Sequence, residues 1–142
     1  MGSVQTIRLE LRSPLFYQAD SGLVPFQYEI DTGELLFCFD LDPVQSRSIE
    51  PDPVTLLGPL VFAGRLERSP VQQQSKSRRL ELPAGIYLFA QERNTLDRNE
   101  FIEMAIEVQK DGLWERLRPA DRLYLRYLFE DGRTVTQVFR PY

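Results

Sequence analysis

Between residues 122 and 140, apolar and polar side chains alternate on both sides of the dipeptide Asp131-Gly132. The apolar positions before this dipeptide are Leu123, Leu125, Tyr127 and Phe129. A period of two is typical of a strand with one buried face, and Asp-Gly is a favoured two-residue turn between antiparallel strands. The end of the chain therefore predicts a β-hairpin, and with it an antiparallel sheet.

Much of the chain before this hairpin also has the pattern of strands. Strands are expected in residues 4–11, 26–31, 35–41, 60–66 and 86–91, with a further short strand before the turn at residues 83–85. Residues 31–34 have turn chemistry and would close a hairpin onto 35–41, which is apolar on both faces like a central strand. Gly64 is expected at a bulge or a close contact. Residues 43–53, rich in proline, and the polar residues 69–79 are expected to be loops.

One segment has the features of a helix. Asp97 and Glu100 have the spacing of a capping box, and apolar residues follow at helical spacing. We expect a helix over about residues 98–110, which runs on to 117 if Gly112 does not end it. Alternation from Met104 to Val108 also fits a strand, with residues 111–112 closing a hairpin onto 113–117. The helix is the favoured interpretation, so the prediction is an α+β fold, a mostly antiparallel sheet with one main helix, in a single domain of residues 1–142.

The chain has one cysteine, Cys38, and no histidine. One cysteine cannot form an intramolecular disulfide, which favours a reducing compartment, and the cytoplasm is the expected location. Histidine is the usual base of serine and cysteine hydrolases, and zinc sites need cysteine and histidine ligands. We therefore expect no metal and no cofactor, and this chemistry favours a protein that is not an enzyme.

The formal net charge of −4 argues against nucleic acid as a partner, since such proteins neutralise phosphates with Lys and Arg. No run of residues approaches the ~18 apolar residues of a membrane helix, so no membrane partner is expected. A small organic ligand, a protein partner or a second copy of the chain remain as partners.

Carboxylates and aromatic residues supply the candidate chemistry. Asp40 and Asp42, two apart at a strand end, would share a face and could bind a divalent ion or share a proton, although Asp42-Pro43 is also a common turn start. Cys38 is flanked by phenylalanines, which predicts a buried packing residue. Aromatic residues can line a ligand cleft, and Glu130 is the acid that we pair with them. The predicted ligand-binding residues are Tyr87, Trp114, Tyr124 and Glu130.

Residues 80–89, LELPAGIYLF, resemble a strand entry in the gyrase-inhibitor-like, or transcription-effector-binding, domains. The order that follows is also similar to that family over residues 80–142: a helix, then Trp114, then two strands ending near a proline. This resemblance implies two similar halves around a cleft for small, often cationic, aromatic ligands, with an acidic residue on a late strand. By motif position, Tyr87, Trp114 and Glu130 are the residues that correspond to positions of that family. The family's helix in the first half would have to lie within residues 14–22.

Three functions are therefore expected, in this order. The first is a non-enzymatic small-molecule-binding domain with an aromatic cleft and an acidic anchor. The second is a protein–protein interaction module that uses an exposed sheet edge or apolar patch. The third is a hydrolase that uses carboxylates such as Asp40 and Asp42.

Overall fold

The computed structural model describes residues 6–20, 22–26, 34–67, 78–93, 96–130 and 132–142. Its strands are β1 (Thr6–Leu11), β2 (Leu15–Ala19), β3 (Glu34–Leu41), β4 (Leu57–Leu66), β5 (Arg79–Leu82), β6 (Gly85–Glu92), β7 (Arg122–Glu130) and β8 (Arg133–Pro141). A 3-10 helix, η1 (Gln45–Arg47), follows β3, and the α-helix α1 (Arg98–Trp114) follows β6. Within these ranges the expected α+β class, a mostly antiparallel sheet with one main helix, is confirmed. No helix there is long and apolar enough to cross a membrane.

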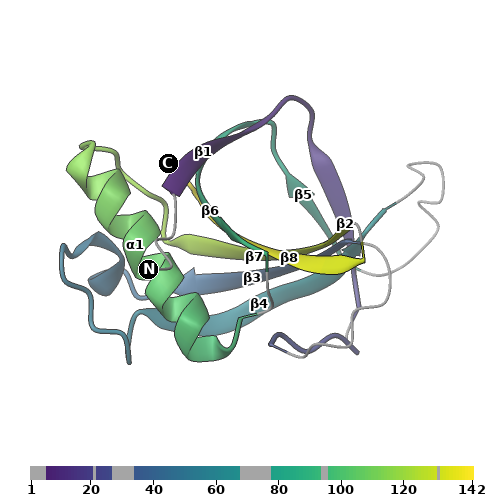
Figure 1. The fold of residues 1–142 in the computed structure, drawn as a ribbon, viewed down its shortest axis with the longest axis horizontal. Coiled ribbons are helices and arrows are strands. Elements are labelled where there is room, and N and C mark those ends of the chain that lie inside the picture. The colour runs from purple at the N-terminus through teal and green to yellow at the C-terminus, as the bar shows by residue number, and fades with distance from the viewer. Residues whose placement is uncertain (1–5, 21, 27–33, 68–77, 94–95, 131) are drawn as a thin grey trace.

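The strands form one antiparallel sheet in the order β1-β6-β8-β7-β3-β4-β2-β5. β1 runs into β2 and β5 runs into β6, so these four strands make one bent, two-stranded ribbon. At its corner the pairing passes from Leu11 opposite Gly85 to Leu15 opposite Leu82. The ribbon pairs with β8 through β6 and with β4 through β2. Figure 1 shows the result, a sheet that curls into a half-barrel with α1 outside it.

Both faces of the curled sheet are buried. On the outer face, α1 packs its apolar side against β3, β6, β7 and β8; this cluster includes Phe37, Phe39, Leu125, Val138, Phe101, Ile102 and Val108. On the inner face the core is rich in aromatic residues: Tyr17, Phe62, Tyr87, Phe89, Tyr124 and Phe139, with Leu36 and Cys38. Successive residues of β3 thus point to opposite cores, as strand geometry requires. Residues 35–41 are a central strand, as expected.

The helix begins and ends at recognisable caps. The Asp97 carboxylate accepts from the Glu100 N–H (2.8 Å), and Glu100 accepts from the Asp97 N–H (3.2 Å), so the predicted capping box is confirmed. The helix passes through Gly112, where a Cβ would lie 2.5 Å from Leu88, and the alternative hairpin is wrong. At the C-terminus, Leu117 N–H donates to Gly112 C=O and Arg116 N–H to Leu113 C=O, the bonds of a Schellman motif.

Several local expectations can now be compared with the structure. The hairpin of β7 and β8 is confirmed, and Gly64 is at a close contact, since its Cβ would lie 2.5 Å from the Gln18 carbonyl. β4 begins at Leu57, earlier than expected. Residues 15–19 form strand β2, which the sequence did not predict and which occupies the place suggested for a short helix. Most of the expected strand and turn at 26–34, and most of the loop at 69–79, lie outside the described residues.

An ion pair lies at one end of the inner core. Arg126 donates to Glu34 (2.8 Å) and to Gln137 (3.1 Å), and the Tyr17 hydroxyl donates to the other Glu34 oxygen. Both charged side chains are largely buried, and the Arg126 Nε has no hydrogen-bond partner among the described residues. Burial raises the pKa of Tyr17, so this hydroxyl remains a donor to Glu34.

Candidate functional site

The residues predicted to bind a ligand lie in different parts of the fold. Tyr87 and Tyr124 are together in the inner core, where both rings contact Phe139 at centroid distances of 5.5 and 5.2 Å. Trp114 is at the end of α1, on the outer side of the sheet, and is 88% exposed. Glu130 ends β7 opposite Arg133, and its side chain lies outside the described part of the chain. The structure thus brings the two tyrosines together and leaves Trp114 apart from them.

The two tyrosines have the surroundings of core residues. Both are buried, and the Tyr87 hydroxyl donates to the Pro83 carbonyl at 2.5 Å. Burial raises the pKa of Tyr87 to about 12 and also raises the pKa of Tyr124. Hydroxyls that stay protonated in this way serve as hydrogen-bond donors within the core.

The structure also shows the surroundings of Asp40, Asp42 and Cys38. Asp40 lies 3.7 Å from Arg122 and both are partly exposed, whereas Asp42 accepts from the backbone N–H groups of Val44 (3.1 Å) and of residue 45 (2.9 Å). The two aspartates thus have separate partners, and no group of three or more His, Cys, Asp or Glu in the described ranges could hold a metal ion. Cys38 is buried, as expected, and desolvation raises its pKa to about 11, which leaves a neutral thiol at neutral pH.

A different region combines order with exposed apolar side chains: residues 42–56, named here the 42–56 loop, which connect β3 to β4 and contain η1. Its ends lie close together because Leu41 pairs with Leu57. Asp42 caps its first turn, and Asp52 accepts from the Val54 N–H at 2.9 Å in its second. Such turns are the expected chemistry of aspartate before proline-rich segments. The loop is a compact unit that is fixed from within.

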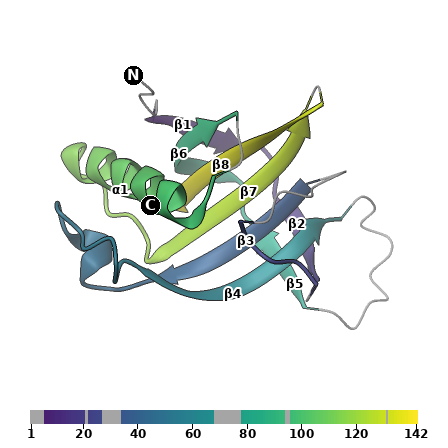
Figure 2. The same ribbon diagram turned by 60° about the horizontal axis from the view of Figure 1, so that its bottom comes forward.

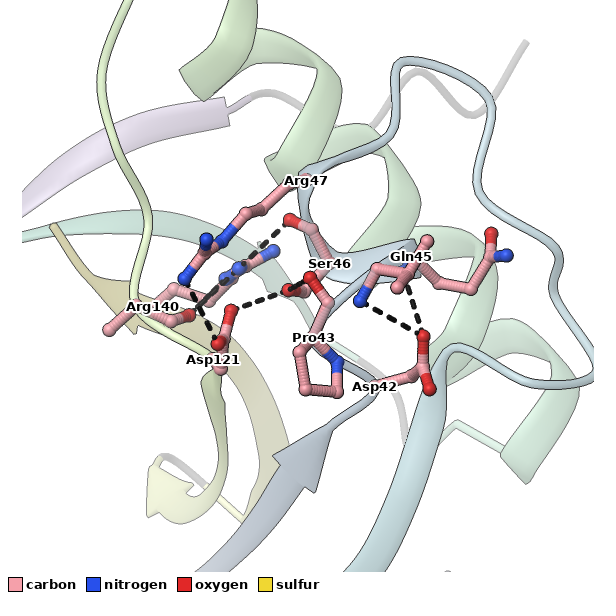
Figure 3. Close-up of polar contacts among 9 residues, drawn as sticks. Asp42, Pro43, Gln45, Ser46, Arg47, Asp121 and Arg140 are labelled. Carbon is pink, nitrogen blue, oxygen red and sulfur yellow. Dashed lines mark hydrogen bonds and ion pairs between the residues drawn. The ribbon is translucent and has the colours of Figure 1, made fainter.

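A buried arginine fixes this loop to the rest of the molecule. Arg140 of β8 is 1% exposed; its guanidinium donates to the Gln109 side-chain oxygen (2.8 Å), to the Ser46 carbonyl (3.3 Å) and to the Ala120 carbonyl (2.7 Å). Figure 3 shows Arg140 pointing beneath the loop toward Ser46. Burial lowers the pKa of Arg140 to about 10, and the group still carries its charge at neutral pH.

Two further contacts complete the attachment. The Gln109 amide of α1 donates to the carbonyls of residue 45 (2.8 Å) and Ser48 (2.7 Å). The Ser46 hydroxyl donates to Asp121 (2.5 Å), which also pairs with the exposed Arg47 (3.3 Å; Figure 3). The loop is therefore bonded to the helix, to β8 and to the segment before β7. Figure 2 shows α1 and the loop at the same end of the molecule.

The 42–56 loop carries three exposed aliphatic side chains. Val44, Ile49 and Val54 are 73%, 73% and 78% exposed. The sequence placed Val44 and Ile49 in an ordinary loop, residues 43–53, and left Val54 unassigned, so these exposed side chains were missed. Three large aliphatic side chains in a segment rich in proline were the available signal, because such residues usually find a place in a core.

Comparison with known proteins finds no matching family model and no matching curated protein, so function is inferred from geometry.

Proposed function

We propose that this protein is a protein–protein interaction module that binds a basic, apolar partner segment through the 42–56 loop. The observation that carries the proposal is the exposure of Val44, Ile49 and Val54 on a loop whose backbone is held by buried bonds. Exposed apolar groups on an ordered surface mark interaction sites, and a surface that is already ordered loses little entropy on binding.

Charge supports the choice of partner. Glu50 and Asp52 of the loop are exposed, and the exposed Arg47 of the loop is paired with Asp121. On the neighbouring helix, the exposed acidic residues outnumber the exposed basic ones: Glu100, Glu103, Glu107 and Asp111 against Arg98 and Lys110. Acidic groups around an apolar centre favour a partner with the opposite charge, because complementary charges steer association and reject acidic surfaces.

The other candidate interfaces have weaker support. Tyr87 and Tyr124 are occupied by core packing, which disfavours an aromatic cleft built on them. A sheet edge is also disfavoured at β4, where Pro59 lacks an N–H and the Val61 carbonyl already accepts from Arg78. The apolar surface therefore has the better claim to be the interface.

Selection from a random peptide library would test the proposal. We expect the selected peptides to combine Lys or Arg with apolar residues. We expect the double variant Ile49→Ser/Val54→Ser to bind them at least about tenfold more weakly, because each buried aliphatic side chain contributes about 1.5–3 kcal/mol. Both positions are exposed in the free protein, so the melting temperature should change little.

The matched control is Val24→Ser, since Val24 is 51% exposed and lies outside the loop. Affinity of this control should equal that of the wild type. Enrichment of acidic peptides, or equal binding by the double variant, would refute the proposal. Sedimentation of the free protein supplies a further outcome: a dimer that the double variant abolishes would assign the surface to a second copy instead.

A further inference from the structure

A second, smaller site lies where β2 leaves β4. β2 pairs with β4 as far as Ala19 opposite Gly64, and a bond from the Asp20 N–H to the Ala63 carbonyl (2.9 Å) ends the contact. Beyond it an open pocket of about 270 Å³ follows the part of the β4 edge that no described strand covers. Its walls include Leu23, Leu60, Val61 and Phe62, with Arg78 and Asp20 as the charged groups.

Arg78 is a positioned cation in this pocket. Its guanidinium donates to the Val61 carbonyl (2.8 Å) and lies over the Phe62 ring, 6.0 Å from the centroid. Its own carbonyl accepts from the Ala19 N–H, which fixes the backbone. No carboxylate within the described ranges forms an ion pair with Arg78, although the side chain is exposed. A guanidinium oriented by a carbonyl and a ring is prepared to receive an anion.

Asp20 does not supply the missing counter-charge. Its carboxylate pairs with Arg65 (2.9 Å) and accepts from the Gly22 N–H (2.9 Å). Arg65 holds the pKa of Asp20 below its usual range, so this carboxylate stays ionised and paired. The charge of Asp20 is thus paired with Arg65, and the positive charge of Arg78 in the pocket lining has no ion-pair partner within the described ranges of a chain of net charge −4. A small anion would be attracted to this position.

The geometry points to a binding site for a small apolar monocarboxylate, with the carboxylate on Arg78 and the apolar body against Leu60, Val61 and Leu23. The volume is near the lower end of ligand pockets, about 300 Å³, and suits a short aliphatic or single-ring acid. The apolar walls select against free phosphate, which has no apolar part to bury. This site is separate from the 42–56 loop.

Thermal-shift and calorimetric titrations with sodium hexanoate and sodium benzoate would test the site. Hexylamine and inorganic phosphate at equal ionic strength serve as comparison ligands. We expect the two carboxylates to raise the melting temperature in a saturable way, and neither comparison ligand to do so. A ligand that binds the folded state alone raises stability with concentration, which gives the dissociation constant.

Two variants locate the binding. Arg78→Gln should abolish the shift, whereas Arg133→Gln, which removes the same charge from an exposed position on β8, should keep it. Leu60→Asn changes a side chain that is 39% exposed, so the fold is retained, and should weaken binding about tenfold. Unchanged hexanoate binding by Arg78→Gln or by Leu60→Asn would overturn the proposal. So would a shift with hexylamine, or one with phosphate as large as with hexanoate.

Discussion

Replacement of Arg140 by methionine tests the buried attachment of the 42–56 loop. Methionine has nearly the length of the arginine stem and fills the space of that stem, but it removes the guanidinium and every hydrogen bond that it makes. The Gln109 side-chain oxygen and the carbonyls of Ser46 and Ala120 then lose their donors. Each buried acceptor without a partner costs about 1–3 kcal/mol, while removal of the buried charge recovers part of its desolvation.

The expected net loss for Arg140→Met is about 2–4 kcal/mol in the free energy of unfolding. Typical domains have about 5–15 kcal/mol, so the variant should still fold. Urea unfolding followed by far-ultraviolet circular dichroism measures the loss. Arg133→Met is the matched control, since it removes an exposed arginine from the same strand and should change stability by less than about 0.5 kcal/mol.

Hydrogen exchange then separates a local effect from a global one. The N–H groups of Ser46 and Ser48 are bonded within the loop and should exchange faster in Arg140→Met than those of β3 and β7. Peptides that bind the loop should also lose affinity, although Arg140 is too deeply buried to touch them. A loss below about 1 kcal/mol with unchanged protection of both amides would refute the idea that Arg140 holds the loop.

Three further outcomes follow from single residues. Arg116 has a positive φ of 61°, a backbone conformation that favours glycine. Arg116→Gly should therefore stabilise the protein by about 0.5–1 kcal/mol in urea unfolding, and destabilisation would refute the idea that the backbone is strained at this arginine. The pKa of Cys38 is raised from 9.0 to about 11 by burial, so the unfolded thiol ionises first and stability should fall as pH rises from about 9 towards 11, with a shallower fall in Cys38→Ala. Trp114, the one tryptophan, is exposed, so its emission should match that of a water-exposed indole and acrylamide should quench it fully; a blue-shifted emission would indicate a covered ring.

The sequence predicted elements whose signals are local. The Asp131-Gly132 turn with its alternating flanks and the Asp97–Glu100 capping box each depend on residues close in the chain, and both elements are present. β2 was missed because it is only five residues long and its apolar residues, Leu15, Phe16, Tyr17 and Ala19, do not alternate with polar ones. The start of β4 was misplaced because Gly58 and Pro59 are typical of turns.

The curl of the sheet and the candidate site could not be predicted in the same way. Tyr87 and Tyr124 fit a ligand cleft or a core equally well from sequence, and the bent ribbon that encloses them depends on pairing between distant strands. The attachment of the 42–56 loop depends on Arg140 and Gln109, which reach it from the far end of the chain and from the helix. Nothing local in the sequence links these residues to Ser46.

The bent ribbon also has a consequence for how the chain reaches this structure. β1 pairs with β6, and β2 pairs with β5. The first two strands therefore cannot complete their pairing until β5 and β6, which follow β3 and β4 in the chain, are available. The β7–β8 hairpin, in contrast, joins neighbours in the chain and can form early. Contacts between distant segments slow folding because loop closure costs entropy before the pairing repays it. During synthesis, the aromatic inner face would remain open until β8, which carries Phe139, emerges and pairs with β6; closure of the sheet is therefore the late step and the period of greatest exposure to aggregation.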